Sequence, residues 1–270
     1  MAEGLFGGWR FRKEKEAPTK ESLPADIFNP EQKRDFEATL HDLSKLYSFM
    51  AGIHERNEKY EISSRAHSID HDLAVAAFAH AIGRKYSKDL AKKSMAAAFV
   101  HSYDRFREAP YESVENFKPE DVKQWVEHTL PEMADAERAE IIQAATGHDR
   151  PNKGRKTDTP NVGDVLADAD KLANLMLYTM VRSGQYLPEK PTLKPGNIDK
   201  LTPGANYKRH NVAFDDIHGM GQWLDDKDWF VTKEAVRTAE VLEKPFKRFI
   251  ATVQRQFAEL GIESIPARRI

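Results

Sequence analysis

Three residues of metal-ligating types stand in small apolar surroundings in this chain: His71, His101 and Asp170. His71 begins the segment HDLAVAAFA, His101 ends the segment AAAFVH, and Asp170 lies inside VLADADKLANL. Imidazole and carboxylate groups bind divalent metals, and helical proteins build metal sites from side chains on facing helices. The pattern therefore predicts a divalent metal ion held between packed helices. The residue after His101, where an acid would complete the set, is Ser102.

The spacing of apolar residues predicts that the elements carrying these side chains are all α-helical, because the apolar positions recur three and four apart and no strand alternation is present. We expect helices over about 30–60, 70–84, 87–108, from 119 onward, 136–145, 161–182, 214–224 and 232–260, with Pro245 kinking the last. The proline-rich segment 188–207 is expected to be a long connection. Residues 24–270 are interpreted as one all-helical domain after a mobile leader over 1–23, with a motif-bearing core at about 63–183 and a C-terminal helical extension at about 208–262.

The composition narrows the class of protein. The 270 residues carry 41 basic and 43 acidic side chains, so no global charge favours nucleic acid or a membrane surface. The absence of cysteine excludes disulfides and thiolate metal ligands. No segment is typical of a signal peptide or a membrane span, and no Walker, GxGxxG or GxSxG motif occurs. We expect a cytoplasmic protein with no membrane partner and no nucleic-acid partner, whose oligomeric state is left open.

The order and context of the three residues resemble the HD superfamily of metal-dependent phosphohydrolases. The likeness rests on His71 with Val75 four residues later, on His101 after AAAFV, and on Asp170 in DADKL. It implies an HD-like helical bundle with extra N-terminal and C-terminal helices, and it implies that the three residues are metal ligands. The family pattern selects Asp170 over Asp168, and likewise His71 over His67.

The chain departs from the family at the His-Asp doublet, because Ser102 stands where the family has a metal-bridging aspartate. A neutral hydroxyl weakens the hold on a hard cation such as Mg²⁺. Asp104 follows His101 by three residues and is a candidate catalytic group that could approach the metal from the same helix face. The alternative is that Asp104 only pairs with Arg105 or a neighbouring cation.

The resemblance also allows a second metal, because some family members use extra histidines between the doublet and the last aspartate. His128 and His148 lie in that interval and are the candidates, although each could equally be a solvated residue at a helix end. A histidine-rich site favours Mn, Fe, Zn, Co or Ni over Mg²⁺.

Cations near the site would handle a phosphorylated substrate. Lys171 follows Asp170 and is the candidate clamp on phosphoryl oxygens, and Arg65 and Arg150 are further candidates for substrate binding. His67 and Asp72 flank His71, and each could be a proton shuttle or a hydrogen-bonding partner of the ligands.

These features favour an HD-type phosphohydrolase that acts on a nucleotide or another small phosphorylated molecule. Two alternatives stay open within the resemblance: a catalytically degenerate HD domain that binds a nucleotide or protein partner, and an HD-type di-iron oxygenase. A helical scaffold whose histidines are all structural is a further alternative.

Overall fold

The computed structural model describes residues 28–59, 68–106, 117–148, 152–176, 182, 187, 189–191, 201–205 and 209–260, and this part of the chain contains helices and loops but no β-strand. The predicted all-helical class is confirmed, and the arrangement is consistent with an HD-like helical bundle. The elements are α1 (Pro30–Asp42), α2 (Ser44–Lys59), α3 (Ile69–Arg84), α4 (Lys88–Val100), η1 (Tyr103–Arg105), α5 (Pro119–Thr129), α6 (Asp135–Gly147), α7 (Val162–Asn174), α9 (Phe214–Asp225), η2 (Lys227–Trp229) and α10 (Lys233–Glu259). The expected leader over 1–23 lies outside the described residues.

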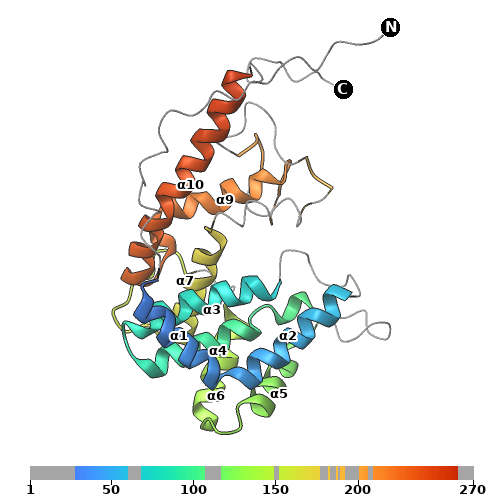
Figure 1. The fold of residues 1–270 in the computed structure, drawn as a ribbon, viewed down its shortest axis with the longest axis vertical. Coiled ribbons are helices and arrows are strands. Elements are labelled where there is room, and N and C mark those ends of the chain that lie inside the picture. The colour runs from blue at the N-terminus through green and yellow to red at the C-terminus, as the bar shows by residue number, and fades with distance from the viewer. Residues whose placement is uncertain are drawn as a thin grey trace, which may run out of the picture.

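Three helices form the centre of the bundle. Helices α3, α4 and α7 pack against one another, α6 covers α4 and α7, and α5 packs against α2 and α6 (Figure 1). Small residues allow the close approach of α3 and α4: a Cβ added to Gly83 would lie only 2.7 Å from the Cα of Ala91. The end of α4 carries only small side chains at the fully buried Ala96, Ala97 and Ala98, so neighbouring helices can also approach it closely. This packing brings the start of α3 next to the end of α4.

Side-chain caps set where several of these helices begin. Asn29 caps α1 and Ser87 caps α4, where its hydroxyl accepts a hydrogen bond of 2.9 Å from the Leu90 N–H. Asn161 and Asp164 form a reciprocal capping box at the start of α7. The register of α7, and with it the direction in which Asp170 points, is therefore fixed at its N-terminus.

The structure differs from the expected helices in three places. The helix expected over 161–182 ends at Asn174. The single helix expected over about 30–60 is broken at Leu43, which is fully buried, and the apolar periodicity hides the break because the partly buried Phe36 and Leu40 of α1 continue the spacing of the buried residues of α2. The helix expected over 87–108 ends at Val100, and the chain then turns through His101 and Ser102 into η1. This early end matters for the site, because the chain leaves the helical path of α4 after Ser102.

The C-terminal helices are tied to the bundle through Asp168 of α7. Its buried carboxylate accepts hydrogen bonds of 2.8 Å from the Val231 N–H, the Thr232 N–H and the Thr232 hydroxyl, at the start of α10. Helix α10 then continues as one helix through Pro245 (Figure 1). No helix among the described residues is both long and apolar enough to span a bilayer.

Candidate metal centre

The first turn of α3 supplies two adjacent buried side chains, His71 and Asp72. Ser68 begins the helix in an extended conformation, and α3 packs between α2, α4 and α7. Because partners surround this end of the helix, both neighbours point into protein, and they are 1% and 0% exposed. Polar groups buried this deeply must be hydrogen-bonded, paired or metal-bound.

The end of α4 supplies His101, also buried. Its Nδ1 donates a hydrogen bond of 2.6 Å to the carbonyl oxygen of Ala98. Because a carbonyl oxygen can only accept, this bond assigns the proton to Nδ1 and leaves the lone pair on Nε2. This is the tautomer that a metal-ligating histidine uses when its other ring nitrogen is held by a carbonyl group.

Asp170 of α7 brings the carboxylate between the two imidazoles. Its Oδ1 lies 3.3 Å from Nε2 of His71 and 3.9 Å from Nε2 of His101, and the two rings are 5.4 Å apart between centroids. The structure therefore brings His71, His101 and Asp170 together from three helices. Asp168, the alternative in the same sequence segment, is instead engaged with the start of α10.

A second set of side chains, with Asp72 in place of Asp170, has separations that fit a bound cation. Ligand atoms of His71, Asp72 and His101 all lie within 4.8 Å of one another, so this buried His-Asp-His group could bind a metal ion. Two ligand atoms on one cation, each at about 2.0–2.2 Å, are at most about 4.4 Å apart. Only small movements would bring these atoms onto one ion. The donor set of imidazoles and carboxylates suits a divalent metal and does not select one metal among those predicted.

The protonation states favour metal binding. Burial lowers the pKa of His71, and the nearby Asp170 only partly offsets this, so the imidazole is neutral at neutral pH. Burial by itself would raise the pKa of Asp170, but the hydrogen bond to His71 and the charges of His101, His71 and His148 hold that pKa well below its usual range. A neutral imidazole and an ionised carboxylate are the forms that bind metals.

Two further side chains orient Asp170. The Asn174 amide donates hydrogen bonds of 3.0 Å to the Asp170 carbonyl oxygen and 3.1 Å to its Oδ1, and Arg182 in turn donates to the Asn174 amide oxygen. Arg182 is buried, and its charge also acts on His71. Neither residue was predicted from the sequence, although Asn174 lies one helical turn after Asp170, a spacing that could have indicated it.

His148, at the end of α6, lies against the cluster. Its ring centroid is 5.2 Å from that of His101, and its Nδ1 donates a hydrogen bond of 2.8 Å to the Ala145 carbonyl oxygen. It repeats the arrangement of His101 at the end of α4. The structure thus places His148 beside the three predicted ligands, as a second-site ligand would need.

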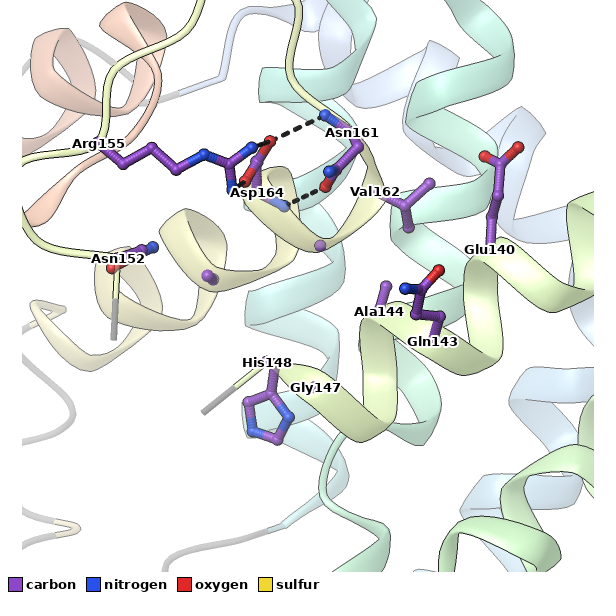
Figure 2. A pocket seen from close by; sticks show the side chains of 12 residues that line it. Glu140, Gln143, Ala144, Gly147, His148, Asn152, Arg155, Asn161, Val162 and Asp164 are labelled. Atoms are coloured by element: carbon purple, nitrogen blue, oxygen red, sulfur yellow. Dashed lines mark hydrogen bonds and ion pairs between the residues drawn. The ribbon is translucent and has the colours of Figure 1, made fainter. Parts of the chain in front are cut away.

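A pocket of about 340 Å³ opens next to His148. Figure 2 shows that it lies between the end of α6, the start of α7 and the loop that holds Arg155. Arg155 donates hydrogen bonds from both terminal guanidinium nitrogens to the Asp164 carboxylate, one of them at 3.0 Å. This ion pair attaches the loop to α7. The remaining polar lining consists of Gln143, Asn152, Asn161 and Glu140.

The other predicted residues have different outcomes. The Lys171 ammonium donates a 3.0 Å hydrogen bond to the Ala167 carbonyl oxygen, and burial lowers its pKa against the charges of Asp168 and Asp170. Oδ1 of Asp104 lies 3.5 Å from Nε of Arg105 within η1, which is the ion pair expected under the non-catalytic alternative.

His128 is exposed on α5 and packs against Phe49, so the structure does not bring it to the cluster. The remaining candidates, Arg65, His67 and Arg150, lie outside the described residues.

Asp72 and His54 contribute more contacts to the candidate metal centre than the sequence indicated. Asp72, considered only as a shuttle or partner of the ligands, is fully buried beside them, and His54 of α2 donates a hydrogen bond of 2.8 Å from its Nε2 to Oδ2 of Asp72. Nothing in the sequence connects His54 with the site, because the contact joins helices that are distant along the chain. Only the buried position of His54 on the apolar face of α2 could have drawn attention to it.

The comparisons with known proteins identify the fold. No protein-family model and no curated protein matches this sequence. The crystal structure of Bacillus subtilis YpgQ in complex with ADP is similar, with a TM-score of 0.52 and 15% identity over 79% of this chain and 97% of that chain. A structural-genomics protein from Lactobacillus plantarum has a TM-score of 0.50 and 13% identity over 80% of this chain and 97% of that chain. Over most of its length, this chain shares the fold of these YpgQ-like proteins.

Proposed function

We propose that this chain is a metal-dependent hydrolase of a small phosphorylated molecule, with a nucleotide as the substrate class. The observation that carries the proposal is the convergence of His71, His101 and Asp170 from three helices, with their ligand atoms turned toward one another. A divalent metal held there would polarise a phosphoryl group and make a water molecule more acidic. The YpgQ structure, which contains ADP, supports the substrate class.

The roles of the protein groups follow from their exposure. Asp170 keeps 26% of its side-chain surface exposed, whereas the histidines are buried, so the substrate approaches from the Asp170 side. Lys171 lies one residue further along α7 and supplies a positive charge to phosphoryl oxygens there. The pocket beside His148 receives the remainder of the substrate, and its amide side chains offer both donors and acceptors to a neutral polar group such as a base or a sugar (Figure 2).

Metal analysis of protein purified without a histidine tag tests the proposal first. We expect about one equivalent of transition metal per chain for the wild type and less than about a tenth of an equivalent for His101→Ala, because a site with buried ligands retains its metal. His128→Ala is the matched control and should keep the wild-type content. Phosphate release from ADP and other nucleotides by the loaded wild type then tests the activity.

A second candidate is a domain that binds the nucleotide without turnover. Ser102 favours it, because this position carries no charge. Metal content with nucleotide binding, but without phosphate release from any substrate in the panel, would select this candidate. Protein that contains no metal and binds no nucleotide would refute both.

A further inference from the structure

Asp72 is a fully buried carboxylate to which the proposed hydrolase assigns no role. It is 0% exposed and lies in the first turn of α3, immediately after His71. A buried carboxylate is costly unless several groups compensate its charge. The groups around Asp72 therefore show how its buried charge is compensated.

Both carboxylate oxygens of Asp72 are held in place. His54 donates to Oδ2 at 2.8 Å, and the Ser102 hydroxyl donates to Oδ1 at 2.9 Å. Each carboxylate oxygen has two lone pairs, so a hydrogen bond to each still leaves capacity for a metal.

The position of this carboxylate is that of a ligand. The ligand atoms of Asp72, His71 and His101 all lie within 4.8 Å of one another. The Ser102 hydroxyl lies between the two residues, 3.3 Å from Nε2 of His101. The small serine leaves room at the end of α4 for the carboxylate that enters from α3.

We propose that Asp72 supplies the second carboxylate of the metal site from α3, in the space that a larger side chain at position 102 would fill. This inference rests on the proposed metal site. His54 and Ser102 are positioning residues: each orients one oxygen of Asp72. The acid absent from position 102 is thus replaced by an acid on the neighbouring helix.

Calorimetric titration of the metal-free full chain with Mn²⁺ tests the inference. Asp72→Asn keeps the shape and removes the charge, and we expect it to weaken Mn²⁺ binding at least about tenfold, since even partners of ligands change metal affinity by about 10–100-fold. Asp70→Asn is the matched control, because Asp70 lies in the same turn of α3 but is exposed, and it should bind as the wild type does.

An exchange of the two side chains separates a ligand from a structural group. Asp72→Ser combined with Ser102→Asp returns one carboxylate and one hydroxyl to the same space, so we expect Mn²⁺ affinity within about threefold of the wild type. Ser102→Asp alone places two carboxylates in contact, so its melting temperature should fall without metal and rise more than that of the wild type when Mn²⁺ is added.

Each outcome decides a different question. Folded Asp72→Asn protein with wild-type Mn²⁺ affinity would overturn the role of Asp72 and leave the proposed function standing. If Asp72→Asn does not fold, an exchanged variant that folds but binds Mn²⁺ at least tenfold more weakly than the wild type would overturn it. A wild type that binds no Mn²⁺ and no other transition metal would overturn the proposed function together with this inference.

Discussion

Two aspartates of α7, two residues apart, should respond to the same substitution in different ways. Asp168 holds the start of α10, and Asp170 faces the candidate metal centre. We expect Asp168→Asn to lower the stability of the fold without removing the metal site, and Asp170→Asn to remove metal binding. The pair thus tests the direction that the register of α7 gives to each side chain.

The cost of Asp168→Asn follows from its hydrogen bonds. Oδ1 accepts from Val231, and Oδ2 accepts from the N–H and the hydroxyl of Thr232. An asparagine oxygen can replace Oδ2, but its NH₂ group then faces the Val231 N–H and leaves that buried donor unsatisfied. Such a loss costs about 1–3 kcal/mol. At the middle of this range, about 2 kcal/mol, the melting temperature of a chain of 270 residues falls by roughly 4 °C.

Asp170→Asn should also lower the free energy of unfolding of the metal-free protein, because the groups that hold the pKa of Asp170 low stabilise its ionised carboxylate, although Asn174 can still donate to the oxygen that remains. Metal affinity should fall at least about 100-fold, the upper end of what the loss of a ligand's partner causes. Thermal unfolding followed by circular dichroism and Mn²⁺ titration measure the two effects. If Asp168→Asn loses the metal while Asp170→Asn still binds it, the assignment of the two faces of α7 is wrong.

Three further substitutions test the packing, a cap and a buried histidine. Gly83→Ala should cost about 1–3 kcal/mol, because its Cβ would meet the backbone of α4, whereas Gly52→Ala, with open space in α2, should gain about 0.5–1 kcal/mol; equal effects would contradict the close approach of α3 and α4. Asp164→Ala removes the capping box of α7 and the Arg155 ion pair and should cost at least about 1 kcal/mol in urea unfolding, so an unchanged midpoint would argue against this anchor. Burial lowers the pKa of His80 below its ordinary 6.5, although Asp35 partly offsets this, so the unfolded chain binds the proton more tightly. Stability should therefore be complete above about pH 6.5 and fall toward pH 5 by at most about 1.4 kcal/mol per pH unit for this group, and His80→Gln should flatten the decline; an unchanged slope would show that His80 does not contribute.

The ligands on α3, α4 and α7 could be predicted because local sequence determines their setting. His71, His101 and Asp170 each interrupt an apolar helix face, and a polar group in such a place has few explanations. The helices themselves followed from the same periodicity. The break at Leu43 could not be predicted in this way, since the apolar periodicity continues across it from the partly buried Phe36 and Leu40.

The position of the Asp72 carboxylate could not be predicted from local sequence. An acid in the first turn of a helix is ordinary, because it interacts favourably with the helix dipole, and exposed Asp70 in the same turn fits that explanation. Asp72 differs only through contacts that span the fold: His54 reaches it from α2, and Ser102 reaches it from the end of α4. Because the start of α3 and the end of α4 lie side by side, the absence of an acid at position 102 and the burial of an acid at position 72 become one structural feature, which no local pattern could have joined.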